Sequence, residues 1–517
     1  MGKGRSGVAR IGFKEKLLRI GLGLFLFAGI VSIVNIMVLP FGRANYHYSW
    51  ILMMIGFAAS VGVFRYAGKK IQLLEEQQAE KAFKVAGALY IVLFVIASLF
   101  AGYWMEYTPS GDNFMLYQAS QKLARDGAFD IGSDFILYFC RFSNQWGFLL
   151  ILTGIYRILF ALGIENTFYP LVIIQMLLYV LMLCSLFRIC QRLSGKKGAL
   201  MTIVMLCLSF PMFLASTVLY TDTFSVPFII FTLDFALKTL SEETTKKKLW
   251  YACLCGIMAL IGAQIKMTVF IVLIAAAIIW ILQMNKTREA AVCIFISFVL
   301  SVGGTAIVHN YVLDRYLDHA IYKQENTPII HWVMMSIPDA NNPYGGYSSD
   351  YAVTWTMMDE GATHKEVMDS IYSRMKDKIY SLRYPNRLLL ALFRKNSAIV
   401  ADGTFGMTEM LDDRPVRRNF VSEIVLEDGK YNAIYSAVVT GIWLSQLFLA
   451  CINAFWEFKE RQYRKAMLEI AALGVLIFLM LWEARSRYIF GFVPVFLMIA
   501  ALPLCLRRRQ NNRENVN

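Results

Sequence analysis

Charged and phenolic side chains stand at the ends of apolar segments in four separate parts of the chain. They are Asp112, Asp222, Lys266 and a group made of Glu483, Arg485, Arg487 and Tyr488. A carboxylate beside a cleft can take a proton from a hydroxyl, and Arg and Lys can neutralise a phosphate. A charge beside a lipid bilayer costs free energy unless it is paired or solvated. Charges from several segments at one depth therefore indicate a reaction on a lipid-attached anion at the membrane surface.

The alternative interpretation is that each of these side chains only anchors a helix end. Lys and Arg commonly extend from helix ends to the lipid headgroups, and Asp commonly caps a helix. The run from Glu483 to Tyr488 is less easily explained in this way than Asp222 or Lys266 alone.

The composition shows what kind of protein must position these groups. Of the 517 residues, 57% are hydrophobic and 17% are charged, and the mean hydropathy is +0.50. Such a chain has too little polar surface for an ordinary soluble enzyme. Its apolar residues form blocks of roughly 20, the length of a membrane-spanning helix. The net charge of +14 lies mainly in short segments between these blocks, which predicts cytoplasmic loops and no nucleic-acid partner.

The alternation of basic and apolar segments predicts about twelve spans with both termini in the cytoplasm, and the first apolar block is expected to be a span and not a cleaved signal. The expected spans are 20–40, 48–67, 85–105, 168–189, 199–217, 224–240, 249–263, 267–283, 290–308, 433–456, 467–482 and 488–506. One further apolar stretch, Gly147 to Gly163, would place four basic residues outside if it crossed. We therefore expect it to lie at the outer interface or to be only partly inserted.

This topology predicts an all-α polytopic membrane protein with four parts. They are an N-terminal helical hairpin (1–84), a transmembrane core (85–308) with a first outer loop (106–167), an outer loop domain (309–431), and C-terminal spans with a basic tail (432–517). Within the first outer loop, Asp112 to Arg125 carries an apolar stripe, which predicts an amphipathic helix on the membrane surface.

Short motifs follow one another in a characteristic order. The first two are Ser110-Gly-Asp112-Asn-Phe-Met-Leu-Tyr-Gln-Ala119 and Tyr138-Phe-Cys-Arg-Phe-Ser-Asn144-Gln145-Trp-Gly147, and the later ones are Phe210-Pro211 before Asp222, Lys266 between two close spans, and Glu483 to Tyr488 before the last span. In this order, over residues 85–506, the sequence resembles the GT-C superfamily of membrane glycosyltransferases. These enzymes use polyprenyl-phosphate sugars and include protein O-mannosyltransferases and the aminoarabinose transferase of lipid A.

The resemblance implies roles for the residues of these motifs. It implies that Asp112 is the base of an inverting displacement and that Asp222 belongs to the same catalytic group. Lys266, Arg485, Arg487 and Tyr488 are expected to bind the donor phosphate. The residues expected to bind the sugar or the acceptor are Glu483, Asn144, Gln145 and His331, the last because its neighbour Trp332 could stack on a sugar.

The chain departs from the family pattern in two respects. Its first two spans look like an addition to the family core, and no Asp-x-Asp motif follows Asp112. No cofactor is therefore expected, and a divalent metal is not indicated, although Asp112, Asp222 and the outer histidines could together bind one.

The resulting hypothesis is a glycosyltransferase in a cell membrane, and the composition of the chain is compatible with a bacterial one. Its active site would face outward, its donor would be a polyprenyl-phosphate monosaccharide, and its acceptor a glycan, glycolipid or protein. A transporter or flippase for lipid-linked glycans is one alternative, with Asp234 as the best mid-span charge. A glycan polymerase or ligase is another.

Overall fold

The computed structural model describes residues 12–38, 49–130, 133–411, 415–461, 463 and 465–501. The basic residues up to Arg10, the tail residues Arg507 to Arg509, and thus the predicted location of both termini, lie outside the described residues. Within the described residues the chain is helical, and a single isolated bridge pairs Tyr107 with Pro415.

Three long helices come first in the chain. They are α1 (Phe13–Val38), α2 (Trp50–Leu73) and α3 (Glu76–Trp104). Helix α2 begins at Trp50 because the Ser49 side chain accepts a hydrogen bond from the Leu52 backbone N–H, and a capping box between Glu75 and Gln78 starts α3.

The first loop segment (106–167) is also helical. Its elements are α4 (Gly111–Asp126), α5 (Asp134–Arg141), η1 (Ser143–Gln145) and α6 (Trp146–Ala161). Helix α4 occupies the stretch expected to form an amphipathic helix, and it ends where Gly127 adopts a left-handed conformation with φ of 77°. The chain bends by 97° between α5 and the helix that follows it.

The central part of the chain is a series of apolar helices. They are α7 (Phe168–Leu208), α8 (Phe210–Leu214), α9 (Thr221–Phe224), α10 (Val226–Ser241), α11 (Thr245–Ile265), η2 (Met267–Val269), α12 (Phe270–Gln283), α13 (Thr287–Phe298), η3 (Val299–Gly303) and α14 (Gly304–Tyr316).

The second loop segment (309–431) and the C-terminal part complete the fold. The elements of the loop segment after α14 are α15 (His319–Glu325), α16 (Ile329–Met335), α17 (Asp350–Asp359), α18 (His364–Ser381), α19 (Pro385–Val400), α20 (Met407–Leu411) and α21 (Phe420–Val425). The final elements are α22 (Asn432–Glu460), α23 (Ala466–Leu481), η4 (Ser486–Tyr488), η5 (Phe490–Phe492) and α24 (Val493–Ala501).

Eight helical stretches of the described residues are long and apolar enough to cross a membrane, or nine if the bent pair around η1 is one span. The prediction of an all-α polytopic membrane protein is therefore confirmed. The number twelve stays a prediction, because three expected spans fall on shorter apolar helices, namely Met267–Gln283, Ala466–Leu481 and Ser486–Ala501. In addition, α7 covers two expected spans as one helix of 41 residues with a break at Gly195.

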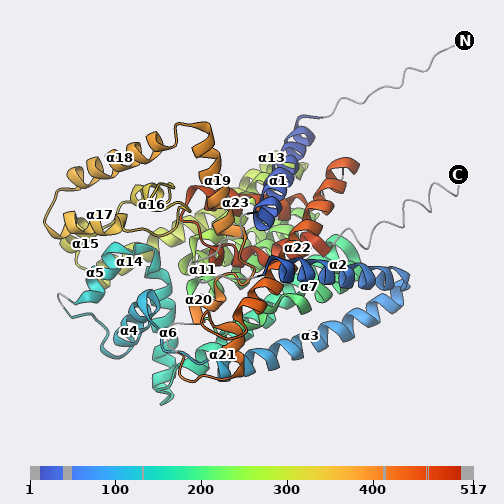
Figure 1. Ribbon diagram of the computed structural model, residues 1–517, viewed down its shortest axis with the longest axis horizontal. Coiled ribbons are helices and arrows are strands. Elements are labelled where there is room, and N and C mark those ends of the chain that lie inside the picture. The colour runs from blue at the N-terminus through green and yellow to red at the C-terminus, as the bar shows by residue number, and fades with distance from the viewer. Residues whose placement is uncertain are drawn as a thin grey trace, which may run out of the picture.

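The two loop segments gather at one end of the bundle. In Figure 1, α4, α5 and α15–α18 lie on the left, whereas the turn between α2 and α3 lies on the right. The second loop segment has a small apolar cluster of its own, built on Met334, Met358, Val367 and Ile371. However, its residues Ala398 to Ala401 and 405–411 contribute to the main core. The second loop segment, which was expected to form an outer loop domain, is thus partly packed into the main helical core.

Helices α2 and α22 pack closely because glycines face the partner helix. A Cβ on Gly441 would overlap the carbonyl oxygen of Met53, and one on Gly56 would come within 2.8 Å of the carbonyl oxygen of Val438. A Cβ on Gly62, also in α2, would meet no described heavy atom within 4 Å. The backbones therefore approach as small residues allow in membrane helix pairs.

Replacing Gly441 by Ala should lower the stability of the folded protein. The added methyl group forces α2 and α22 apart, at a cost of about 1–3 kcal/mol. The measurement is the melting temperature of the purified protein in one detergent. Gly62→Ala is the matched control, since it adds the same group to a helix without contact. An equal effect of both substitutions would contradict close packing at Gly441.

Candidate functional site

Asp112 is presented at the start of α4, on the side where the loop segments gather. Gly111 has a positive φ of 52°, so the chain turns sharply before the helix. The Asp112 side chain is exposed and accepts two hydrogen bonds, from the hydroxyl of Tyr138 at 3.0 Å and from that of Tyr220 at 3.3 Å. Two phenols thus hold a carboxylate in place while leaving it accessible to another molecule.

Asp222 lies in a different environment, buried between two cations. It belongs to the short helix α9 and is 2% exposed. One carboxylate oxygen forms an ion pair with Nζ of Lys266, and the other lies 3.7 Å from Nε of Arg487. The group therefore holds two positive charges against one negative charge.

Tyr220 joins these two environments. Its hydroxyl donates to Asp112 and accepts a hydrogen bond of 3.2 Å from Nε2 of Gln145. The guanidinium carbon of Arg487 lies 5.7 Å from the centre of the Tyr220 ring. One aromatic side chain consequently contacts both the exposed carboxylate of Asp112 and the partly buried guanidinium of Arg487.

The ring of Tyr488 contacts both cations, Lys266 and Arg487. Nζ of Lys266 is 4.2 Å from the centre of its ring, and the guanidinium carbon of Arg487 is 5.2 Å from it. The Tyr488 hydroxyl donates to Glu483 at 3.0 Å. Both cations are therefore held by ring contacts as well as by Asp222.

Arg485 is engaged differently from Arg487. Its Nε donates to Glu483 at 3.1 Å, and its Nη1 donates to Glu409 at 2.8 Å. Two carboxylates therefore balance its charge.

Two loops of the second loop segment hold the stretch from Glu483 to Tyr488. The Ala484 backbone N–H donates to the carbonyl oxygen of Gly345 at 2.9 Å. On the other side, Asp402 accepts hydrogen bonds from the Ser486 hydroxyl at 2.7 Å and from the Gly406 backbone N–H at 3.0 Å. The cation-bearing stretch is thus fixed by residues about 80 and 140 positions earlier in the chain.

Most of the residues predicted from the sequence lie in this one network. It contains Asp112, Gln145, Asp222, Lys266, Glu483, Arg485, Arg487 and Tyr488. Sequence reasoning missed Tyr220, Asp402 and Glu409 as members. The run Asp402-Gly-Thr-Phe-Gly406 was the available signal for Asp402, because an Asp followed by two glycines often forms a turn.

Asn144 and His331 are the two predicted residues for which the structure gives no hydrogen bond or ion pair with the described residues of this network. Asn144 is exposed in η1, next to Gln145. His331 is fully buried in α16, where one ring nitrogen lies 3.0 Å from the Thr354 hydroxyl. Burial, assisted by the charge of Arg374, lowers the pKa of His331 from 6.5 to about 4. Contact between His331 and a sugar would require this interior to open.

The network can provide an accessible general base and, beside it, a site for an anion. No group of three or more His, Cys, Asp or Glu side chains in the described part of the chain is arranged to hold a metal ion.

Asp222→Asn should destabilise the folded protein strongly. The substitution removes the carboxylate that contacts the partly buried Lys266 and Arg487, which costs about 3–5 kcal/mol. The melting temperature in a fixed detergent is the measurement. Asp428→Asn removes an exposed carboxylate bound to Arg418 and should cost less than about 1 kcal/mol. Similar shifts in melting temperature for the two variants would contradict the proposed role of Asp222 in holding Lys266 and Arg487 together.

The lowered pKa of His331 predicts a loss of stability in acid. The folded state binds a proton less readily than the unfolded chain, so this contribution is complete above pH 6.5 and is lost as the pH falls toward about 4. Between about pH 7 and about pH 5 the loss is roughly 2 kcal/mol. Melting temperatures across this range should fall less for His331→Gln than for the native protein. The exposed His364, replaced by Gln, is the control and should leave the native pH dependence unchanged.

Comparison with known proteins agrees with the membrane fold. No curated protein matches the chain. Residues 31–505 match a family described as conserved hypothetical integral membrane protein, and this match covers most of the sequence. The chain is accordingly a multi-pass member of this family of integral membrane proteins.

Proposed function

We propose that the protein is an inverting glycosyltransferase that moves a monosaccharide from a polyprenyl-phosphate donor to an acceptor in the cell envelope. The observation that carries the proposal is the arrangement around Tyr220. The Tyr220 hydroxyl binds the exposed carboxylate of Asp112, and the guanidinium carbon of Arg487 lies 5.7 Å from the centre of the same ring. Such a pair supplies a base for an attacking hydroxyl and a positive charge for a phosphate leaving group.

The pairing of two cations, Lys266 and Arg487, with the single carboxylate of Asp222 supports an anionic ligand. Lys266 and Arg487 share a single carboxylate, and Nε of Arg487 is buried without a hydrogen-bond acceptor among the described residues. A buried donor without a partner costs free energy. A phosphate beside the pair would remove that cost. It would also fit the planar donor geometry of Arg487.

The phosphate is assigned to Lys266 and Arg487 in preference to Arg485. Arg485 already binds Glu483 and Glu409, so the local charge there is negative. Asp222 is assigned a positioning role because of its burial and its contacts with the two cations. It is 2% exposed and bound to the two cations, so it is poorly placed to receive a proton from an acceptor.

The proposed reaction needs no further reactant. Asp112 takes the proton of the acceptor hydroxyl as its oxygen forms a bond to the anomeric carbon. The bond between that carbon and the phosphate oxygen breaks, and polyprenyl phosphate leaves with the electron pair. Lys266 and Arg487 stabilise the negative charge on the phosphate. Tyr138 and Tyr220 keep the Asp112 carboxylate oriented toward the acceptor.

Asp234, the mid-span charge that could belong to a transport pathway, is paired with neighbouring cations. Asp234 is 1% exposed and forms ion pairs with Arg188 at 3.2 Å and with Lys238 at 2.8 Å. These partners belong to α7 and α10, so the charge belongs to a helix contact. Transfer chemistry is therefore preferred to transport as the proposal.

Asp112→Asn should abolish transfer while the protein remains folded and inserted. Loss of a general base lowers the rate by about 10²–10⁴-fold. The assay incubates the purified full-length protein in lipid nanodiscs with polyprenyl-phosphate hexose and measures the release of polyprenyl phosphate. Asp126→Asn, which removes an exposed carboxylate of the same helix, is the control and should retain native activity.

Two results would contradict the proposal. Native activity of Asp112→Asn would remove the assignment of the base. Release of polyprenyl diphosphate from a diphosphate-linked glycan, with no use of the monophosphate donor, would instead support a polymerase or ligase.

A further inference from the structure

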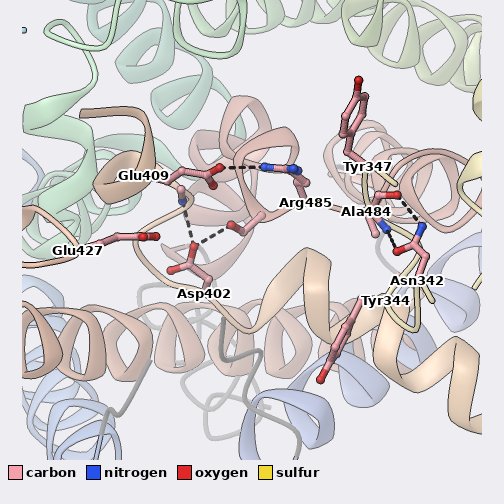
Figure 2. Close-up of a pocket in the computed structure, with 11 residues that line it drawn as sticks. Asn342, Tyr344, Tyr347, Asp402, Glu409, Glu427, Ala484 and Arg485 are labelled. Carbon is pink, nitrogen blue, oxygen red and sulfur yellow. Dashed lines mark hydrogen bonds and ion pairs between the residues drawn. The ribbon is translucent and has the colours of Figure 1, made fainter. Parts of the chain in front are cut away.

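A polar pocket of about 200 Å³ lies beside the proposed reaction site. It is called the Arg485 pocket, and the lining residues that matter here are Asn342, Tyr347, Asp402, Glu409, Glu427 and Arg485. Figure 2 shows the three carboxylates on one side and Asn342 on the other, with the Glu409 and Arg485 side chains pointing toward each other. Among the residues that line the pocket, Arg485 is the one that the sequence predicted as a site residue.

The walls of the pocket are fixed before any ligand binds. The Asn342 side chain donates to the Gly346 carbonyl oxygen at 2.7 Å and accepts from the Gly346 backbone N–H at 3.0 Å. On the opposite side, the hydrogen bonds of Asp402 to Ser486 and to the Gly406 backbone close a tight turn. A preorganised pocket loses little conformational entropy when a ligand binds.

The chemistry of the lining selects one class of ligand. Three carboxylates and one guanidinium line the pocket, so carboxylate oxygens predominate among its charged groups and favour ligand groups that donate hydrogen bonds. The hydroxyl groups of a sugar are such donors, and a tyrosine ring can cover the apolar face of a sugar ring. The volume of about 200 Å³ is below the roughly 300 Å³ at which pockets for drug-sized molecules begin. It suits a single ring.

The pocket adjoins the proposed anion site. Gly406 lines the pocket, and a Cβ built on it would lie 3.2 Å from Cβ of Arg487. Gly406 also has a positive φ of 68°. A side chain at this position would therefore strain the turn and press on the residue that we assign to the phosphate.

Aromatic side chains connect the pocket with Asp112. Tyr347 stacks on Tyr351 with ring centres 4.9 Å apart, and contacts continue through Trp355 and Phe142 to Tyr138, the donor to Asp112. Burial raises the pKa of Tyr347, and the charges of Tyr351, Asp112 and Glu483 raise it further. The negative charge of Asp112 therefore acts on Tyr347 at the wall of the pocket.

We propose that the Arg485 pocket binds one neutral or amine-bearing sugar ring. The assignment of this ring to the reaction rests on the function proposed above, in which the ring belongs either to the donor or to the acceptor glycan. In both cases the sugar and the phosphate are held by separate groups.

Direct binding is tested on the full-length protein in nanodiscs by hydrogen–deuterium exchange. The probes are methyl glycosides of glucose, galactose, N-acetylglucosamine, glucosamine and rhamnose, with inorganic phosphate as a separate probe. At least one glycoside should protect backbone amides of residues 342–347 and 401–406. Glu427→Gln and Tyr347→Ala should weaken that binding at least tenfold. Glu360→Gln and Tyr372→Ala, which alter exposed residues of the same loop segment, should not.

The outcomes separate the two proposals. Protection by phosphate alone, by no glycoside, or equally in the pocket and control variants would overturn the sugar pocket, even if the protein consumes the donor. Protection by a glycoside without donor use would retain the pocket and reject the proposed function. If both hold, an increased KM for polyprenyl-phosphate hexose in Glu427→Gln identifies the ring as the donor sugar. Unchanged release of polyprenyl phosphate to water, with weaker transfer to an added glycoside, identifies it as the acceptor.

Discussion

The ion pairs of Asp222 determine how the ends of three chain segments meet. A carboxylate that is 2% exposed is stable in an apolar bundle only with its charge balanced, and Lys266 and Arg487 supply that balance from helices far apart in the sequence. Because Asp222 contacts both cations, the same interaction that joins the segments also positions the two side chains that we propose to bind a phosphate.

The second loop segment contributes to the membrane domain as well as to the pocket. Its residues Ala398 to Ala401 and Phe405 are buried in the main core, and Asp402 between them binds Ser486. Movement of this turn would alter the position of Arg487, because Gly406 packs against it. A single turn thus connects the apolar core, the wall of the Arg485 pocket and the proposed phosphate site. This connection explains why a loop with many charges is nevertheless inserted into the bundle.

Residue type and position relative to the apolar segments predicted much of the network. Asp112, Asp222, Lys266 and Arg487 each stand at the end of an apolar segment, and membrane physics makes such charges conspicuous. Tyr220 was not found, because a tyrosine at this depth is ordinary in membrane proteins. The glycines after Asp402 indicate a turn, but the hydrogen bond from Ser486 to Asp402 depends on packing between distant segments, which no local pattern encodes. His331 was chosen because its neighbour Trp332 suggested a binding face, and local sequence could not show that tertiary packing buries the His331 ring against Thr354.

The contrast between Asp112 and Asp222 carries the assignment of chemical roles. Both are acids near a helix start, and the sequence alone treats them alike. In the fold, Asp112 is exposed and receives hydrogen bonds only from neutral phenols among the described residues, so its charge remains available to a proton donor. Asp222 is buried and occupied by two cations, so an acceptor hydroxyl cannot readily reach it. Exposure and partner charge, not residue type, therefore make Asp112 the candidate base and Asp222 the residue that positions the cations.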